Sequence, residues 1–373
     1  MDAERLVVGI DGRELLGRPT GTGRYLRNLL RCWAGGPDDL LVYFNGPAPA
    51  EPVLEERSIH PRPLGDGRAR GVVWQERVLP KAAKADGVDV FFSPAYSCPL
   101  SLDRPRVTAV HDLSFFAHPQ DFAYLDGLRR RLLVGASIRA SRRVLACSDF
   151  TRRELVRLFP DAAERVVYVP LGPDDDLPPA PLRTVARTRL SAEGPYLLTV
   201  GAILNRRCLP VLLRATAHLR RAHPRLVLDV VGENRTHPRL DLAALVDELG
   251  LEDRVRLSGF TGETGLADRY AAADVAVFLS EYEGFGLPAL EAAARGVPLV
   301  VSREPALGEV FADAALLVDP HDETAVAAAI DRAVRDTSLR ERLVSAGYAL
   351  ARRYSWAETA SQTRAALVAA ARP

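Results

Sequence analysis

Short apolar runs rich in β-branched residues alternate with longer amphipathic segments along most of this 373-residue chain. That alternation is typical of a doubly wound α/β fold, in which helices cover both faces of a mostly parallel sheet. The pattern starts at residues 6–10 and starts again at residues 196–201, and the length allows two separate cores. We therefore expect two Rossmann-like domains.

The boundary between the two domains is predicted from a composition change. We expect an N-terminal domain over 1–173, a linker over 174–194 and a C-terminal domain over 195–354, with a closing helix in 355–373. The passage 173–181 is acidic and proline-rich, which is typical of a linker. An Asp-x-Asp match, Asp174 to Asp176, falls there, so we interpret it as solvated charge and not as a metal site.

Charge and cysteine usage exclude several classes of protein. Lys+Arg 49 against Asp+Glu 48 leaves a net charge of +1, which argues against a dedicated nucleic-acid binder. The four cysteines are far apart and have no histidine at ligand spacing, so neither a zinc site nor a disulfide framework is indicated. The acidic N-terminus does not resemble a signal peptide, and no apolar run approaches the ~20 residues of a membrane span. We expect a cytoplasmic protein. The cysteines are Cys32, Cys98, Cys147 and Cys208.

The most informative stretch is a predicted strand, loop, helix and strand over 275–301. Gly284 and Gly286 allow the loop backbone to approach a ligand closely, and Pro288 suits the first turn of a helix. A helix N-terminus behind glycines is a site for anions and hydroxyl groups.

Two carboxylates, Glu283 and Glu291, frame this helix start. Each has an ordinary structural explanation. The helix dipole alone favours Glu291, and Glu283 could be an exposed loop acid. Considered singly, neither residue distinguishes a binding role from a structural one.

The complete string, with seven residues between the glutamates and Gly-Phe-Gly-Leu-Pro among them, closely resembles the signature of glycosyltransferase family 4. These are retaining, sugar-nucleotide-dependent enzymes of GT-B fold. The resemblance implies two domains facing across a cleft, an acceptor site in the first, a donor site in the second and a C-terminal helix that crosses back to the first. It also implies that no metal or other cofactor is needed. By resemblance, catalysis involves Glu283, His111 and Arg207, and donor binding involves Arg206, Arg207, Glu291, Gly284, Phe285, Gly286, Leu287, Gly21, Gly23, Gly259 and Phe260.

The loop before the helix predicted over 210–222 carries paired arginines, Arg206 and Arg207. They could simply be solvated. The loop resembles an Arg-Lys-Asn triplet of the family that holds the donor diphosphate, with Arg207 in place of lysine and Cys208 in place of asparagine. A guanidinium can bond two phosphate oxygens where an ammonium acts as a point charge, so the first departure preserves the chemistry. Nothing in the sequence explains Cys208.

In the first half of the chain, Gly21 and Gly23 follow the first strand, but a dinucleotide site is disfavoured because the sixth motif position is Leu26. By resemblance, this turn faces the acceptor and the phosphates. The strand predicted over 106–110 delivers His111 to its carboxyl end, where ligands of α/β sheets bind. His111 is either a satisfied loop histidine or, by resemblance, a contact with the donor sugar or its developing charge.

Two further regions have predicted contacts. By resemblance, the nucleotide base lies near Gly259 and Phe260. Arginines are dense over 129–157. They form either a solvated helix surface or a basic face that meets an anionic acceptor or a membrane surface.

These observations predict transfer of a hexosyl unit, with retention, from a donor of the GDP-mannose or UDP-hexose type to a hydroxyl acceptor. The acceptor could be a glycan, a lipid-linked sugar or a small natural product. The alternatives are a pseudo-glycosyltransferase, a GT-B epimerase and a non-catalytic sugar-nucleotide-binding protein.

Overall fold

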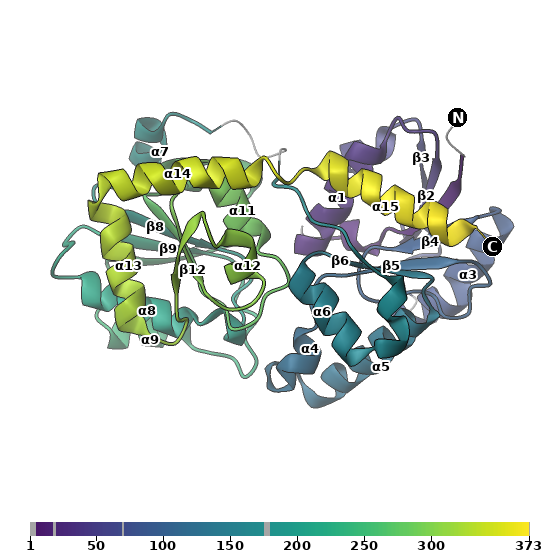
Figure 1. The fold of residues 1–373 in the computed structure, drawn as a ribbon, viewed down its shortest axis with the longest axis horizontal. Coiled ribbons are helices and arrows are strands. Elements are labelled where there is room, and N and C mark those ends of the chain that lie inside the picture. Colours follow the sequence, from purple (N-terminus) through teal and green to yellow (C-terminus); the bar gives the residue numbers. More distant parts are fainter. Residues whose placement is uncertain (1–4, 18–19, 69–70, 175–179, 373) are drawn as a thin grey trace. The chain divides into compact units, whose positions relative to one another are not determined.

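The computed structural model describes residues 5–17, 20–68, 71–174 and 180–372. The chain forms two compact units, each built around its own parallel sheet (Figure 1). Unit 1 comprises residues 1–113, 125–172 and 355–373, and unit 2 comprises residues 114–124 and 173–354. The predicted fold class, two Rossmann-like α/β domains, is confirmed. Residues 114–124 group with unit 2, which the predicted boundary at 173 did not anticipate.

Seven parallel strands form the sheet of unit 1, in the order β3-β2-β1-β4-β5-β6-β7. The winding reverses between β1 and β4, and ligands of open α/β sheets bind at such a point, beyond the carboxyl ends of the strands. The strands are β1 (Val7–Asp11), β2 (Asp39–Asn45), β3 (Ile59–Leu64), β4 (Val90–Ser93), β5 (Arg106–Val110), β6 (Arg143–Ala146) and β7 (Val166–Tyr168). The helices of the first half are α1 (Gly21–Trp33), α2 (Gly71–Val73), α3 (Leu79–Ala85), α4 (Ser114–Ala117), α5 (Tyr124–Ala140) and α6 (Asp149–Leu158).

Strand β3 was not found from the sequence. It contains Pro61 and Pro63, which cannot donate to a ladder and therefore disguise a strand. The structure accommodates both prolines because β3 lies at the edge of the sheet and pairs only with β2.

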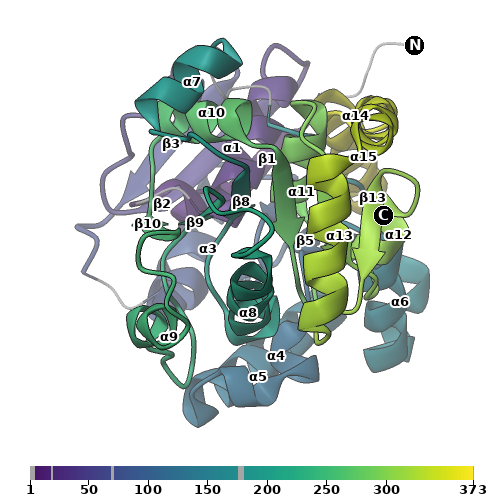
Figure 2. The ribbon, with the colours of Figure 1, turned by 90° about the vertical axis from the view of Figure 1, so that its left-hand side faces the viewer.

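Six parallel strands form the sheet of unit 2, in the order β10-β9-β8-β11-β12-β13. Helices α8, α9 and α13 share an apolar core with one face of this sheet, and α10 and α11 lie on the other face (Figure 2). The strands are β8 (Tyr196–Val200), β9 (Val227–Val231), β10 (Val255–Gly259), β11 (Val275–Phe278), β12 (Leu299–Ser302) and β13 (Ala315–Val318). The helices are α7 (Arg183–Arg189), α8 (Leu209–Leu219), α9 (Leu242–Glu248), α10 (Glu263–Ala272), α11 (Leu287–Ala294), α12 (Leu307–Phe311), α13 (Glu323–Arg335) and α14 (Thr337–Ala351).

The predicted linker, 174–194, contains a helix. Helix α7 lies inside it and packs on α10, and Arg187 donates a hydrogen bond of 2.9 Å to Asp274. The prediction missed this helix because the proline-rich composition just before it dominated the pattern. Within the acidic run, Asp175 and Asp176 lie outside the described residues.

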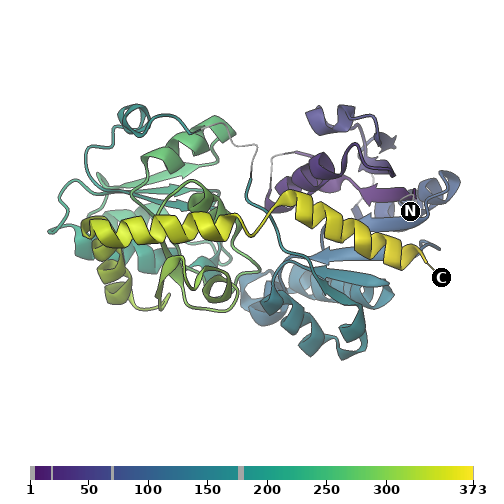
Figure 3. The same cartoon turned by 45° about the horizontal axis from the view of Figure 1, so that its top comes forward.

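The last helix, α15 (Trp356–Ala371), belongs to unit 1, although it follows α14 of unit 2 directly. It lies along α1 (Figure 3). Arg364 donates hydrogen bonds of 2.7 and 3.0 Å to Asp38, whose side chain is fully buried. The ion pair therefore fastens the helix to the turn before β2.

In the described part of the chain, no helix combines the length and the apolar character that a bilayer span requires.

Candidate functional site

The winding of the unit 2 sheet reverses between β8 and β11, which are neighbours in the sheet. The loops that follow these two strands, residues 201–208 and 279–286, therefore leave the sheet side by side. They carry the predicted arginines and Glu283. Strand order thus brings together two sequence motifs that are more than seventy residues apart.

Polar contacts join the two loops. The backbone N–H of Glu281 donates to the carbonyl of Arg206 at 2.8 Å. Arg206 Nε donates to the carbonyl of Tyr282 at 3.2 Å, and Arg207 Nη2 lies 2.9 Å from Glu283 Oε2. The loops therefore form one polar surface in which Arg207 and Glu283 are paired.

Arg206 and Arg207 occupy different environments. The Arg206 side chain is buried beneath the second loop, with 7% of the residue exposed, where it supports the Tyr282 carbonyl. The side chains of Arg207 and Glu283 are 22% and 15% exposed. Of the two predicted phosphate contacts, this placement favours Arg207, whereas Arg206 positions the loop.

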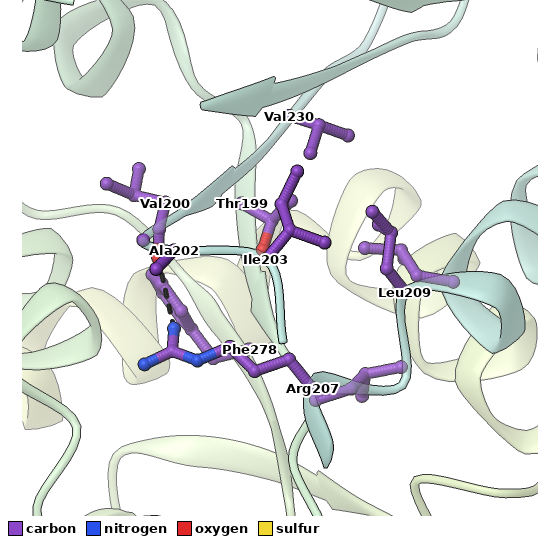
Figure 4. Close-up of a pocket in the computed structure, with 11 residues that line it drawn as sticks. Thr199, Val200, Ala202, Ile203, Arg207, Leu209, Val230 and Phe278 are labelled. Atoms are coloured by element: carbon purple, nitrogen blue, oxygen red, sulfur yellow. Dashed lines mark hydrogen bonds between the residues drawn. The ribbon is translucent and has the colours of Figure 1, made fainter. Parts of the chain in front are cut away.

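Arg207 points back toward the end of β8, where Nη1 lies 3.4 Å from the Val200 carbonyl (Figure 4). Its Nε is buried and has no hydrogen-bond partner among the described residues. The adjoining cavity has a volume of about 20 Å³, which holds roughly one water molecule.

Two glycines that sequence reasoning did not assign to the site shape the space for Arg207. Gly201 has φ +125°, and a Cβ there would lie 2.6 Å from Arg207 Nη1. Gly232 has φ +156°, and a Cβ there would lie 1.9 Å from the Gly201 carbonyl oxygen. The two glycines directly follow β8 and β9, so a glycine at the end of an apolar run was the available signal.

The glycine loop leads directly into the start of α11, as the sequence predicted. Gly286 has φ +95° and forms the N-cap of α11, and a Cβ there would lie 2.5 Å from Leu307 Cδ2. The N–H of Leu287, in the first turn, has no carbonyl partner within the helix. Phe285 is buried and packs edge-to-face on Tyr354, with ring centroids 5.5 Å apart. Its ring belongs to the core, so a ligand would meet only its backbone.

Glu291 is almost completely buried, with 2% exposed. The hydroxyl of Tyr270, on α10, donates a hydrogen bond of 2.9 Å to Glu291 Oε2. Sequence reasoning missed Tyr270 because only packing of α10 beside α11 brings the two together. The predicted ribose contact of Glu291 stays a prediction.

The predicted base-binding pair lies at the end of β10. Gly259 has φ +60°, and Phe260 is 48% exposed. An exposed ring beyond the carboxyl end of a strand is available for stacking. The contact itself stays a prediction.

The remaining predicted residues lie in unit 1. Helix α1 begins at Gly21, and Thr20 caps it by accepting a hydrogen bond of 3.0 Å from the Gly23 N–H. Gly23 is required by packing, because a Cβ there would lie 2.5 Å from the Glu14 carbonyl oxygen. Tyr25 in α1 contacts the ring of His111, with ring centroids 4.7 Å apart.

His111 follows β5 and is held in one tautomer. Its Nε2 lies 2.8 Å from the Pro94 carbonyl oxygen, which can only accept, so Nε2 carries the proton. Burial lowers the pKa of His111, although the Pro94 carbonyl and Asp112 oppose the shift. The ring is therefore neutral at pH 7, with Nδ1 as its acceptor nitrogen.

The arginines of the 129–157 region form local ion pairs. Arg129 and Arg130 both contact Asp126, and Arg152 and Arg153 both contact Asp149. Pairs at i,i+3 and i,i+4 are typical of a solvated helix surface.

Cys208, unexplained from the sequence, is the N-cap residue of α8 and has an unusual backbone conformation. Its φ of +47° is left-handed, which an L residue other than asparagine or aspartate rarely adopts. Its thiol donates to Glu281 at 3.7 Å. Burial, and then the charge of Glu281, raise the pKa of Cys208 to about 12.

Comparison with known proteins gives the class to which this geometry belongs. The family models described as Glycosyltransferase Family 4 and Glycosyl transferases group 1 match residues 19–177 and 184–350. Sucrose-phosphate synthase of Thermosynechococcus elongatus has the same fold, with a TM-score of 0.80, 22% identity, and coverage of 97% of this chain and 98% of that chain. Fold and matches define a glycosyltransferase of the GT-B type.

Sequence relatives narrow the class. The O-antigen chain mannosyltransferase B of Escherichia coli is 34% identical, over 92% of this chain and 94% of the relative. The D-inositol 3-phosphate glycosyltransferase of Kineococcus radiotolerans is also 34% identical, over 71% of this chain and 66% of the relative. The chain belongs to glycosyltransferase family 4.

Proposed function

We propose that this glycosyltransferase moves a hexosyl unit from a GDP-mannose or UDP-hexose donor to an acceptor hydroxyl, with retention at the anomeric carbon. The observation that carries the proposal is the Arg207 guanidinium at the junction of β8 and β11. One nitrogen pairs with Glu283, and Nε is buried without a partner among the described residues. A diphosphate oxygen would accept a charge-assisted hydrogen bond from the exposed part of this guanidinium.

The chemistry places opposite charges at the two ends of the breaking bond. Cleavage between the anomeric carbon and the diphosphate leaves negative charge on phosphate and positive charge on the sugar ring. We assign stabilisation of the negative charge on phosphate to Arg207 and the start of α11. We assign contact with sugar hydroxyls near the anomeric carbon to Glu283. In a front-face displacement, the acceptor oxygen attacks as the phosphate leaves, and the leaving phosphate oxygen takes the acceptor proton. The guanidinium and the helix N-terminus supply positive potential, so the proposal includes no metal.

Named relatives support the choice of donors. The Escherichia coli relative is called a mannosyltransferase, which favours a mannose donor. The Anabaena protein HepE, of similar fold with a TM-score of 0.75 and 20% identity over 97% of this chain and 99% of that chain, was solved in complex with UDP and glucose. These names support a hexosyl donor on a nucleoside diphosphate.

Donor binding is tested by thermal stabilisation with GDP, UDP, GDP-mannose and UDP-glucose. A ligand at about a hundred times its dissociation constant should add ~2.7 kcal/mol to the free energy of unfolding. We expect one nucleotide sugar to stabilise more than its free nucleotide. Glu283→Gln should abolish that difference while leaving the effect of the nucleotide, whereas Glu252→Gln, at an exposed site, should change neither.

Product analysis distinguishes transfer from its rivals. Retention is checked from the anomeric configuration of the product by NMR, and inverted product would contradict the mechanism. Release of hexose or of an epimer without an acceptor would indicate an epimerase. Coupling of non-sugar rings would indicate a pseudo-glycosyltransferase. Binding without turnover of any donor would indicate a non-catalytic protein.

We also propose that α5 touches an anionic membrane surface. Leu125, Leu128 and Leu132 repeat on one face of this helix and are 76%, 37% and 65% exposed. Arg129 and Arg130 lie beside them. An apolar face flanked by arginines matches helices that lie in the membrane interface. The predicted cytoplasmic location stays a prediction.

Co-sedimentation with phosphatidylglycerol vesicles checks this contact. We expect binding that weakens about 10-fold in a Leu125→Ser, Leu132→Ser double variant, because buried leucines supply much of the interfacial affinity. Leu182→Ser removes an equally exposed leucine, at 76%, from outside α5 and should have no effect. Equal binding of wild type and double variant would exclude α5 as the contact.

A further inference from the structure

One cluster of potential metal ligands lies beside the proposed donor site and has no role in it. Cys208 Sγ, a Glu281 carboxylate oxygen and a His321 ring nitrogen lie within 4.8 Å of one another. They come from the loops after β8, β11 and β13, all in unit 2. Cysteine spacing in the sequence did not reveal this cluster, because strand order brings its residues from three distant segments to one sheet edge.

We propose that Cys208, Glu281 and His321 form a zinc site, with a fourth position open to water. Thiolate, imidazole and carboxylate are the side chains that bind Zn²⁺ in proteins. Glu281 Oε1 is 3.7 Å from Cys208 Sγ and 3.6 Å from His321 Nε2. Tetrahedral coordination with Zn–S of about 2.3 Å and Zn–N or Zn–O of about 2.0 Å separates such ligands by roughly 3.3–3.5 Å. The two separations from Glu281 exceed this range by only tenths of an ångström.

Neighbouring groups hold the carboxylate in place. His118 Nδ1 lies 3.6 Å from the other oxygen, Oε2, of Glu281, and the His118 ring packs on Tyr282. Asp121 attracts His118 electrostatically, on the same 114–124 segment. Partners of this kind orient the carboxylates that bind metals.

Zinc binding replaces one proton. The Cys208 S–H bond breaks, the proton goes to solvent, and the sulfur lone pair binds the metal, which deprotonates a coordinating thiol. No oxidant or reductant is involved. The bound ion would connect the Arg207 loop to the loops after β11 and β13.

The test uses the full chain, stripped of metal by a chelator and free of nucleotide sugar, so it does not depend on the proposed function. Titration with Zn²⁺ should give one site per chain by calorimetry. Co²⁺ in place of Zn²⁺ should give a thiolate-to-cobalt charge-transfer absorption. We expect His321→Ala to weaken Zn²⁺ binding by at least about 10-fold, and Cys208→Ser to abolish the absorption.

Matched controls separate this cluster from others. His218 lies 3.1 Å from Glu323 in a comparable histidine–glutamate pair without a cysteine, and Cys32 is an exposed thiol. His218→Ala and Cys32→Ser should leave Zn²⁺ affinity and the cobalt spectrum unchanged. Cys208→Asn guards against loss of folding, because asparagine tolerates the left-handed backbone, and it should melt no lower than wild type while losing the absorption.

Two results would overturn the proposal. One is the absence of a stoichiometric Zn²⁺ site in the wild type. The other is Zn²⁺ binding that Cys208→Ser and His321→Ala leave intact.

Discussion

Replacing Arg207 by alanine is expected to lower kcat/KM for the nucleotide-sugar donor by about one to two orders of magnitude. The proposed phosphate contact is charge-assisted and worth ~1.5–3 kcal/mol, and each 1.36 kcal/mol corresponds to a factor of ten. Donor affinity, measured by thermal shift or calorimetry, should fall as well. Steady-state kinetics with the donor identified in the panel is the measurement.

Two further variants make the Arg207 prediction specific. Arg207→Lys keeps the charge but loses the planar fork and Nε, so its activity should lie between those of wild type and Arg207→Ala. Arg214→Ala removes a guanidinium that is 47% exposed on α8 and should behave as wild type. Wild-type turnover by Arg207→Ala would show that the phosphate assignment is wrong.

Replacing Arg364 by alanine is expected to destabilise unit 1 by about 3 kcal/mol. Removing one member of a buried ion pair typically costs ~3–5 kcal/mol, because the other charge stays buried. The lower end applies here because the Arg364 side chain is 24% exposed, and the Leu6 N–H and Trp33 Nε1 still donate to Asp38. Urea unfolding followed by tryptophan fluorescence measures the effect, since Trp33, Trp74 and Trp356 all lie in unit 1.

The destabilisation caused by Arg364→Ala should depend on pH. Burial tends to raise the pKa of Asp38, but the hydrogen bonds from Arg364 and Trp33 outweigh it and hold the pKa below its ordinary value of 3.8. A depressed carboxyl pKa contributes stability above the ordinary pKa, and the contribution is lost as pH falls through the folded-state pKa. The difference in free energy of unfolding between wild type and Arg364→Ala should therefore be largest at pH 7 and should shrink below about pH 4.

The exposed counterpart of this ion pair supplies the control. Arg5 pairs with the adjacent Asp39, and their side chains are 69% and 27% exposed. Arg5→Ala should cost less than about 1 kcal/mol, because solvent screens such a pair. Equal losses in the Arg5 and Arg364 variants would contradict the argument from burial.

The periodicity of the sequence predicted most of the fold, because strand and helix patterns are local. The runs at 275–279 and 299–301 correspond to β11 and β12, and the start of α11 follows Gly286 as expected. The two elements that the sequence did not predict were also missed for local reasons. The prolines of β3 conceal an edge strand, and the composition before α7 conceals a helix.

The sequence by itself determined the family, the two sheets, and the residue types of the site, because glycines, caps and apolar spacing act within a few residues. Only the tertiary structure decided how those residues are used. The adjacency of β8 and β11 pairs Arg207 with Glu283, turns Arg206 into a buried support and places Cys208 beside Glu281. Such contacts join segments dozens of residues apart, and strand order, which no local pattern encodes, determines which segments meet.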